Sequence, residues 1–512
     1  MASHDPPDGL FVFRDPDTPR RLREVLAQAD FTDRGVAQTL GGETIRSASS
    51  QDVPLLLRRT GRATPQDTLI RLFLIGVPVE ADAASKAVAP MPLEEWVRLG
   101  LLELRGTSVV AAVQLVPFQG LVLAHDRPQQ IHAGLAPDYV MGIGSSSLTL
   151  ANVTVRRPSA RTLDLGTGCG LLALLAAAHS TQVLAVDRNP RAVRLAAFNA
   201  RLNGLENVEC REGDLFEPVR GLEFNLVVTN PPFVISPESR YIYRDSGLGG
   251  DEVVRSIVRQ VPGFLAEGGF CQILCNWAHV AGEDWRERLA GWFAANGCDA
   301  WVMRTDTLDA AAYAVKWIRH TERDEPEQLG RRFEEWTAYY ERQRIEAISG
   351  GVITLRRRTA PANWFRADEG PEKMLGPAGD FIAQAFDLRD FLESVRDDEA
   401  LLRQPLRLSP DARLEQHFAP AEGGWAVAES ELKLQRGLAY SGRVDPYFAC
   451  MLAQFDGRRP LCELAADLAA MIQEDPAKTA PACLELVRRL IERGFLLPAP
   501  SNLTQSSSLP PV

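Results

Sequence analysis

A chain of 512 residues is longer than one ordinary domain. Hydrophobic residues make up 45% and charged residues 24%, which is typical of soluble globular proteins and excludes wholesale disorder. The eight cysteines form no C-x₂-C pair, so neither a zinc ribbon nor a disulfide framework is indicated. Most of the net charge of −11 lies beyond residue 360, so the acidity of the whole chain does not exclude a nucleic-acid substrate.

The chain carries no signal for export or membrane insertion. Met1–Arg14 is rich in Asp and Pro and lacks the apolar stretch of a signal peptide. No run of about 18 apolar residues, the length that crosses a bilayer, occurs. We therefore expect a protein without membrane contacts in the reducing cytoplasm.

Residues 1–130 are predicted to form a small helical domain. Helical spacing is found at 19–28, 32–40, 65–74 and 92–102, and β-like runs at 108–116 and 121–124 are joined by a turn at 118–120. Helices followed by a hairpin are the order of a winged-helix-like module, and the same order suits a plain packing domain.

From 131 to 360 strands and helices alternate, which predicts a parallel sheet. Strands are expected at 161–165, 182–187, 208–212, 224–229, 270–275, 299–304 and 352–357. The fold class is therefore α/β, with a doubly wound, seven-stranded, Rossmann-like core. Between 305 and 350 we expect one or two inserted helices, one of them at 327–345.

Residues 361–512 are predicted to form an accessory domain of mixed α and β structure. Pro and charge clusters between 359 and 371 indicate a linker. Short strands are expected at 406–408 and 425–428, and helices at 446–454, 461–472 and 480–493. The helices again suggest a winged-helix-like fold, and the polar tail at 501–512 is expected to be disordered.

The strongest chemical signal is Thr162–Leu171, TLDLGTGCGL, in which a strand gives way to a Gly-rich turn and an apolar helix. Open α/β sheets bind nucleotides at such a turn. The glycines match the dinucleotide fingerprint only in its looser form, and no phosphate-loop Lys is present. We therefore favour a nucleoside ligand without pyrophosphate, with Asp164 near its amine, while the spacing alone leaves a dinucleotide open.

The next two predicted strands each end at a carboxylate. Asp187 follows Gly166 at the separation expected of the acidic residue that binds ribose hydroxyls. Asp214 ends the third strand, where a short carboxylate can accept a hydrogen bond from an adenine amino group. Alone, Asp214 would suit a turn or a helix cap, and its register with Asp164 and Asp187 favours a binding role.

The fourth predicted strand ends at Asn230-Pro231-Pro232-Phe233. Pro-Pro cannot continue a central strand, so the chain turns out at the C-terminal edge of the sheet. The Asn230 amide oxygen and the Pro231 carbonyl can accept both hydrogens of an –NH₂ group, and the Phe233 ring can stack on a planar amide or base. Accepting those hydrogens localises the nitrogen lone pair, so positioning and electrostatics can carry an in-line methyl transfer.

These motifs resemble the class I S-adenosylmethionine-dependent methyltransferases, and among them the N-methylating branch marked by (N/D)-P-P-(F/Y/W). The resemblance implies S-adenosylmethionine as the cofactor and no metal. It implies a cofactor site of Asp164, Gly166, Thr167, Gly168, Asp187, Arg188, Asp214, Leu215 and Asn230. It implies that the acceptor nitrogen is held by the catalytic set Asn230, Pro231, Pro232 and Phe233.

Two subfamilies compete for the identity of the acceptor. The run NPPFVISPE at 230–238, with Gly249-Gly250-Asp251, resembles the HemK-type glutamine methyltransferases that modify release factors, although these more often have Tyr in place of Phe233. The methyltransferase small domain group, which acts on guanine amino groups of ribosomal RNA, favours NPPF but commonly has His in place of Val234.

We favour protein glutamine, for example in a release factor. The alternatives are an rRNA, tRNA or DNA base (guanine N2 or adenine N6), a small molecule or peptide, and a non-catalytic binding protein on a methyltransferase core.

Two further segments flank these motifs. Ser145–Ser147 lies just upstream of the Gly-rich strand, a position that often covers the cofactor in this enzyme class. Arg240, Tyr241, Tyr243 and Arg244 follow the NPPF turn, and their basic–aromatic pattern suits stacking on bases or a lid packed over the pocket equally well.

Overall fold

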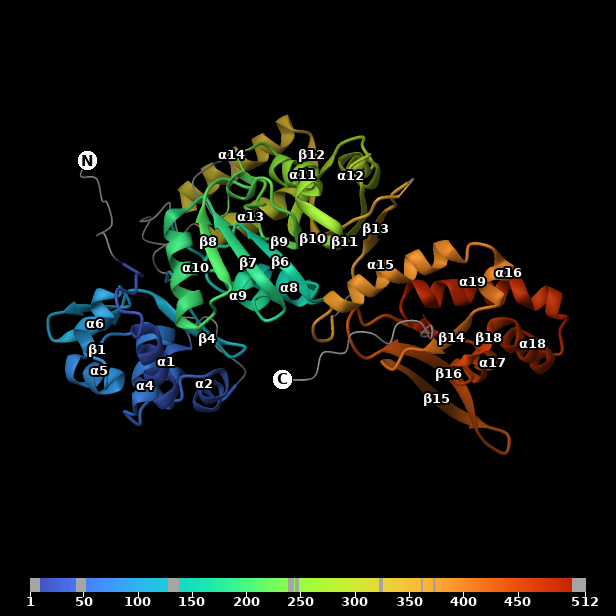
Figure 1. The fold of residues 1–512 in the computed structure, drawn as a ribbon, viewed down its shortest axis with the longest axis horizontal. Helices are drawn as coiled ribbons and strands as arrows, with labels where there is room; N and C mark the ends of the chain where they lie inside the picture. The colour runs from blue at the N-terminus through green and yellow to red at the C-terminus, as the bar shows by residue number, and fades with distance from the viewer. Residues whose placement is uncertain are drawn as a thin grey trace. The chain divides into compact units, whose positions relative to one another are not determined.

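The computed structural model describes residues 10–42, 52–127, 138–237, 244, 248–321, 326–360, 362–371 and 374–499. Two compact units make up the chain: residues 1–151 with 157–369, and residues 152–156 with 370–512 (Figure 1). The tail predicted to be disordered, 501–512, lies outside the described residues.

Unit 1 begins with a helical part. Its helices are α1 (Thr18–Gln28), α2 (Asp33–Leu40), α3 (Val53–Arg59), α4 (Pro65–Ile70), η1 (Arg71–Ile75), α5 (Ala81–Val88) and α6 (Leu93–Arg98). Strands β1 (Val79–Glu80), β2 (Leu102–Arg105) and β3 (Ser108–Ala111) form a small antiparallel sheet in the order β1-β3-β2.

A separate hairpin follows, made of β4 (Gln114–Phe118) and β5 (Leu121–His125). The run 108–116, predicted as one strand, is therefore two strands that belong to two sheets. The chain bends between them because the N–H of Ala112 bonds the Leu101 carbonyl and Val113 is fully buried.

The largest sheet has eight strands in the order β13-β11-β12-β10-β9-β6-β7-β8. They are β6 (Ser159–Leu165), β7 (Ser180–Asp187), β8 (Val208–Glu212), β9 (Phe224–Thr229), β10 (Leu265–Val280), β11 (Cys298–Asp309), β12 (Ile345–Arg357) and β13 (Phe365–Glu369). Only β12 runs antiparallel to its neighbours. The prediction of a doubly wound α/β sheet is confirmed.

The predicted count of seven strands is one too few, because β13 lies where a linker was expected. It pairs in parallel with β11, with Ala300 opposite Phe365. The buried Asp299 carboxylate anchors this extra edge strand, since it accepts hydrogen bonds from Arg356 at 2.7 Å and from the Trp364 N–H at 3.2 Å. Charged residues are common in the edge strand of a sheet, and the charges in β13 are the reason why its sequence resembles a linker.

Helices cover both faces of the sheet. They are α8 (Ser145–Val153), α9 (Leu171–Ala176), α10 (Pro190–Leu202), α11 (Glu252–Gln260) and α12 (Trp285–Phe293), with short 3₁₀ turns η2 (Glu217–Val219) and η3 (Val261–Phe264). Alternate residues of β7 serve different cores: Val183 and Ala185 pack with α9 and α10, whereas Leu184 and Val186 pack with α11 and α12. The insertion predicted between 305 and 350 is a helical hairpin of α13 (Ala310–Thr321) and α14 (Pro326–Arg342).

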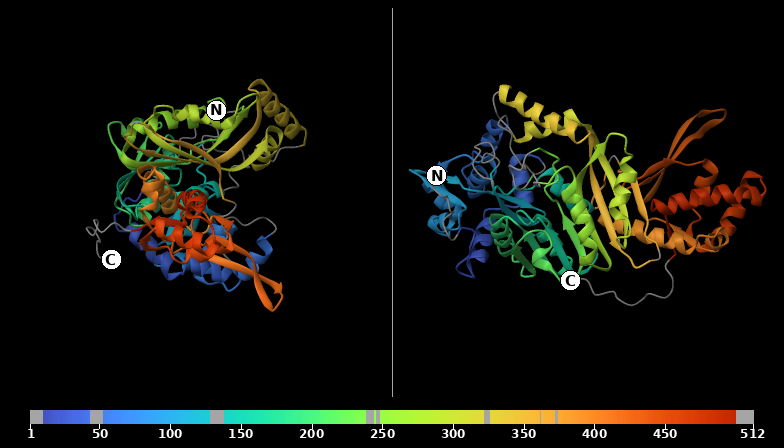
Figure 2. Two further views of the ribbon diagram at one scale, coloured as in Figure 1. Left: turned by 90° about the vertical axis from the view of Figure 1, so that its right-hand side faces the viewer. Right: turned by 90° about the horizontal axis from the view of Figure 1, so that it is seen from above.

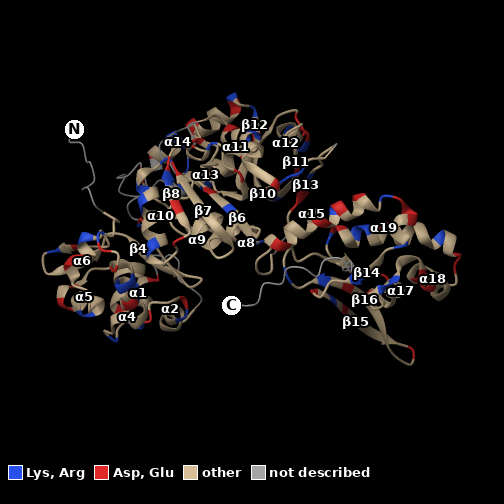
Figure 3. Ribbon diagram, in the orientation of Figure 1, with Lys and Arg blue, Asp and Glu red and all other residues tan. Residues whose placement is uncertain are grey.

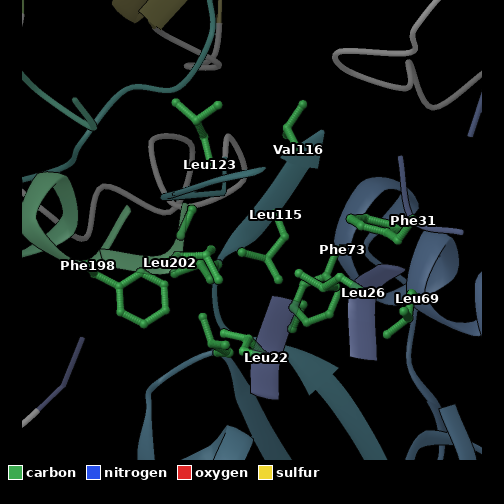
Figure 4. Close-up of a cluster of buried hydrophobic side chains, with 14 of the residues drawn as sticks. Leu22, Leu26, Phe31, Leu69, Phe73, Leu115, Val116, Leu123, Phe198 and Leu202 are labelled. Carbon is green, nitrogen blue, oxygen red and sulfur yellow. The ribbon is translucent and has the colours of Figure 1, made fainter. Parts of the chain in front are cut away.

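The helical part and the sheet share one hydrophobic core. Figure 4 shows Leu22 and Leu26 of α1 and Leu115 of β4 in the same cluster as Phe198 of α10. The Phe13 ring stacks on Phe198 with centroids 4.5 Å apart. The N-terminal part is therefore packed against the sheet of unit 1 by apolar burial, which is the main stabilising force of a fold.

Two asparagines of α10 complete this junction. Asn199 accepts from the Ala124 N–H and donates to the carbonyls of Ala124 and Cys169, each at 2.8 Å. One helical turn later, Asn203 makes the same pair of bonds to Val122, also at 2.8 Å. The two side chains thus bond the backbone of β5 as a neighbouring strand would.

Unit 2 combines five helices with two small sheets. The helices are α15 (Gly379–Ser394), α16 (Asp398–Leu402), α17 (Pro446–Leu452), α18 (Leu461–Ile472) and α19 (Pro476–Glu492). The strands are β14 (Pro405–Leu408), β15 (Ala412–Ala421), β16 (Gly424–Leu434), β17 (Ser441–Arg443), β18 (Asp456–Pro460) and β19 (Leu496–Pro498), in the sheet orders β18-β14-β19 and β15-β16-β17. The β15–β16 hairpin extends from the rest of its unit (Figure 2), and near its tip Trp425 is 72% exposed.

Acidic and basic positions both occur along the helices of each unit (Figure 3). Among the described residues, no helix is long and apolar enough to cross a membrane.

We expect Asn199→Ala to lower the free energy of unfolding by about 3 kcal/mol, because it leaves several buried backbone groups without partners. Asn203→Ala is the matched control: its site is half-buried, so water can replace the lost bonds, and about 1 kcal/mol is expected. Urea denaturation of both variants measures the difference. If both variants lost the same small amount of free energy of unfolding, the hydrogen bonds of Asn199 would not stabilise the junction as a buried site should.

Candidate active site

A cavity of about 360 Å³ lies at the C-terminal ends of the central strands β6, β7, β8 and β9. The chain leaves β6 for β7 on one side and later returns to β9 on the other, so the cavity lies where the strand order reverses. Ligands of open α/β sheets bind at this topological switch point. Of the predicted residues, it is lined by Gly166, Thr167, Gly168, Asp187, Arg188, Asp214, Leu215, Asn230, Pro231 and Pro232.

The Gly-rich turn gives the cavity a wall of bare backbone. Gly166 and Gly168 have φ of +74° and +55°, a left-handed conformation that costs other residues about 1–2 kcal/mol. A Cβ at either position would meet no atom within 4 Å. Glycine is needed there for the shape of the turn, and the space beside it stays open for a ligand.

Asp187 fixes this turn and keeps acceptor capacity for a ligand. Its carboxylate accepts from the N–H of Gly168 and the N–H of Asn189, both at 2.9 Å. Burial raises the pKa of Asp187, partly offset by these N–H groups and by Arg188. Each carboxylate oxygen has a second lone pair, so a diol at the cavity can still bind here.

Asp164 does not line the cavity, although the family pattern placed it there. It is fully buried behind the turn, where one oxygen accepts from the Thr167 hydroxyl at 2.6 Å and from the Ala173 N–H at 3.0 Å. Burial raises the pKa of this carboxyl to about 7. Its visible role is to hold Thr167 and the first turn of α9.

Asn230 presents an open acceptor at the end of β9. Its amide nitrogen donates to the hydroxyls of Ser146 and Ser147 over long distances of 3.4 and 3.5 Å. Its amide oxygen is buried and has no donor among the described residues. Buried polar atoms are normally paired, so this oxygen is suited to a donor that the chain itself does not supply.

The other residues of the NPPF motif lie in two places, some at the cavity and one against a hydrophobic core. Pro231 and Pro232 line the cavity, but Phe233 does not. The Phe233 ring is half-buried and meets Trp317 of α13 edge to face, with centroids 6.4 Å apart. The chain turns between Pro232 and Phe233, which carries the ring to the side of the inserted hairpin.

Several cavity residues were not predicted: Tyr139, Val140, Met141, Gly142, Leu248 and Val253. The segment 139–142 is held from two sides, because Asp126 accepts from the Val140 N–H at 2.8 Å and Asn189 donates to the Asp138 carbonyl at 2.8 Å. A Cβ on Gly142 would lie within 2.3 Å of the His125 ring. The glycine was visible in the sequence, but its close neighbour was not.

Neither a metal nor a thiolate is indicated at this site. The described residues contain no group of three His, Cys, Asp or Glu side chains that could hold a metal ion. Cys169 lines the cavity, but burial raises the pKa of its thiol to about 12, which keeps it protonated and unreactive. Arg240, Tyr241 and Tyr243 lie outside the described residues, whereas Arg244 is buried with its guanidinium over the Trp336 ring.

Comparison with known families agrees with this geometry. Residues 141–283 match the family model described as methyltransferase small domain. Residues 28–112 and 383–498 match two models described as domains of unknown function, DUF7059 and DUF7782.

Curated relatives of this domain are glutamine methyltransferases. The release factor glutamine methyltransferase of Xylella fastidiosa is 35% identical over 23% of this chain and 47% of its own length. That of Escherichia coli is 32% identical over 27% and 54%, and the ribosomal protein uL3 glutamine methyltransferase of Bradyrhizobium diazoefficiens is 41% identical over 22% and 40%. The chain thus spans about half the length of these relatives.

The raised pKa of Asp164 predicts a pH-dependent stability. Because its pKa is about 7 in the folded protein and 3.8 ordinarily, the folded state keeps a proton that the unfolded chain has lost. This carboxyl therefore makes the fold less stable as the pH rises from about 4 to about 7, and has no further effect above that range.

Urea denaturation at each pH should show that the free energy of unfolding of Asp164→Asn, relative to that of the wild type, increases as the pH rises from about 4 to about 7. Above about pH 8 the difference between the two free energies should stay constant. A constant difference from pH 4 to pH 8 would mean that Asp164 does not titrate with a raised pKa.

Proposed function

We propose that this chain is an S-adenosylmethionine-dependent N-methyltransferase that methylates the side-chain amide of a protein glutamine. The Asn230 amide oxygen carries the proposal, because it is buried at the cavity and open to an outside N–H donor. Its orientation is set, since the other end of the same amide is turned to Ser146 and Ser147.

The lining of the cavity supports S-adenosylmethionine as its ligand. The bare backbone at Gly166 and Gly168 would hold the amino-acid tail, and the free lone pairs of Asp187 would accept from the ribose hydroxyls. Asp214 would accept from the adenine amino group, beside Leu215. When bound, the cofactor supplies a methyl group on a positively charged sulfur.

The protein's part of the reaction is to orient and polarise the acceptor. A primary amide is a poor nucleophile because its nitrogen lone pair is delocalised. The Asn230 oxygen and the Pro231 carbonyl would accept its two hydrogens, which localises the lone pair and aims it into the cavity. Pro232 would restrict the backbone that carries these two oxygens, and Phe233 would border the acceptor on the side of Trp317.

The names of the relatives support the choice of acceptor. They act on release factors and on a ribosomal protein, so we propose a protein of the translation apparatus, methylated in the cytoplasm. An RNA or DNA base offers the same kind of amino group to the same motif, and is the principal alternative.

We also propose that the flanking parts, 1–130 and 361–512, are winged-helix-like helper modules around a catalytic domain at 131–360. The order α4, β1, α5, α6, β2, β3 with the sheet β1-β3-β2 supports this for the first module. In the second, α17, β18, α18, α19 and β19 follow the same order, and β14 supplies the middle strand.

Transfer of a labelled methyl group from S-adenosylmethionine into a bacterial cell extract tests the acceptor class. We expect incorporation that protease abolishes and that RNase and DNase leave intact. Loss of the label with RNase or DNase alone would show that the acceptor is a nucleic acid. Binding of S-adenosylmethionine without transfer to any fraction would favour a binding protein on a methyltransferase core.

Two substitutions should separate cofactor binding from transfer. Asp187→Ala removes charged hydrogen bonds worth about 1.5–3 kcal/mol each, so the affinity for S-adenosylmethionine should fall roughly 10- to 100-fold in calorimetry. Asn230→Ala should keep that affinity within a few-fold and lower transfer at saturating cofactor by more than about 100-fold.

Glu212→Ala is the control for lost charge, because Glu212 lies opposite Asp187 on β8 but is exposed and does not line the cavity. The roles assigned to the two residues would be wrong if Asn230→Ala abolished cofactor binding or if Asp187→Ala left it unchanged.

A further inference from the structure

The helical hairpin α13–α14 contacts the loops on the acceptor side of the cavity. It is inserted between β11 and β12 and lies beyond the matched segment 141–283. Its aromatic side chains form a core with the residues that follow the NPPF motif, including Val234 and Ile235. The hairpin therefore borders the site with residues that the family match does not cover.

Two tyrosines bond the backbone of a single residue next to the motif, one on each side of its Cα. The Tyr313 hydroxyl accepts from the Ile235 N–H at 3.3 Å, and the Tyr340 hydroxyl donates to the Ile235 carbonyl at 2.8 Å. Ile235 is fully buried, and both tyrosines are almost fully buried. With its N–H and C=O both held by rigid side chains, the backbone two residues after Phe233 has little freedom.

The Tyr313 hydroxyl also reaches the neighbouring strand β10, where it accepts from the Asn276 amide at 2.6 Å. The hydroxyl thus joins the loop after β9 to β10. Burial raises the pKa of Tyr313 far above its ordinary value, so this hydroxyl stays neutral at every practical assay pH.

The hairpin also makes a hydrogen bond to the far end of the loop that follows β9. The Tyr339 hydroxyl accepts from the Gly250 N–H at 2.8 Å, close to the cavity residues Leu248 and Val253. Between the two ends, the Arg244 carbonyl accepts from Val234, and the Arg244 guanidinium lies 5.7 Å from the Trp336 ring centre. Three points of the segment between the motif and α11 are therefore held by one helix, α14, and by its partner α13.

We propose that the α13–α14 hairpin positions the acceptor-binding turn, with Tyr313 as a positioning residue that acts through Ile235. This role rests on the proposed methyl transfer, for which Asn230 and Pro231 must face the acceptor amide. Displacing reacting groups by about 1 Å can cost about 100-fold in rate, so a loosened turn should lower transfer while the cofactor half of the cavity is unaffected.

Tyr313→Phe tests this, because it keeps the ring and removes only the hydroxyl. Transfer of labelled methyl groups into the protease-sensitive fraction, at saturating S-adenosylmethionine, should fall roughly 10- to 100-fold. The affinity for S-adenosylmethionine in calorimetry should stay within about twofold. Hydrogen exchange of a peptide that contains Ile235 should become faster, since the N–H loses its acceptor.

The double variant Tyr313→Phe/Tyr340→Phe should lose less than the product of the two single losses, because both hydroxyls act on the backbone of the same residue, Ile235. Thr337→Ala is the matched control, since the Thr337 hydroxyl donates only within α14, to Phe333 and Glu334, and no change is expected in transfer or exchange.

The outcomes separate this inference from the proposed function. Unchanged transfer in Tyr313→Phe, or an equal fall in transfer and cofactor affinity, would overturn the positioning role. If the wild type binds S-adenosylmethionine but transfers nothing, the proposed function fails. Hydrogen exchange at Ile235 is then the measurement that tests the role of the hairpin. Faster exchange in Tyr313→Phe with no change in Thr337→Ala supports the role of the hairpin, and unchanged exchange overturns it.

Discussion

The buried ion pair between Asp126 and Arg191 connects the N-terminal part, the cavity wall and helix α10. Asp126 is 1% exposed and lies just after β5, and Arg191 lies in the first turn of α10. A buried pair is costly unless the remaining lone pairs are used, and here Asp126 also accepts from the Val140 N–H. The carboxylate therefore fixes the segment 139–142 against the helix that begins beside Asp187. At its other end the same helix bonds β5 through Asn199 and Asn203.

The part of the cavity at the strand ends could be predicted from the sequence because it depends on local geometry. Parallel strands bring their C-terminal ends to one edge, so the residues after four predicted strands had to meet there. Asp187, Asp214 and Asn230 all lie at the cavity for this reason. Asp164 differs because a side chain one residue before the end of a central strand points into the packed interior, where Thr167 and Ala173 bind it.

The parts that were missed depend on contacts between distant segments. The wall at 139–142 is set by Asp126 and Asn189, and nothing in its own sequence indicates a strand or a helix. Strand β13 looked like a linker because its pairing depends on the buried Asp299. The helices α13 and α14 were expected as an insertion, yet their contacts with Ile235 and Gly250 could not be read from spacing. The motif alone therefore does not reveal these contacts, because the side chains that make them come from distant parts of the chain.

The shared core of unit 1 bears on how the chain is made. N-terminal domains commonly fold while the rest of a protein is still being synthesised. Here Leu22 of α1 and Leu115 of β4 are buried in one cluster with Phe198 and Leu202, which are translated much later. Until α10 has left the ribosome, that apolar surface and the backbone of β5 lack their partners. The N-terminal part of this chain therefore stays incompletely packed until α10 has been synthesised.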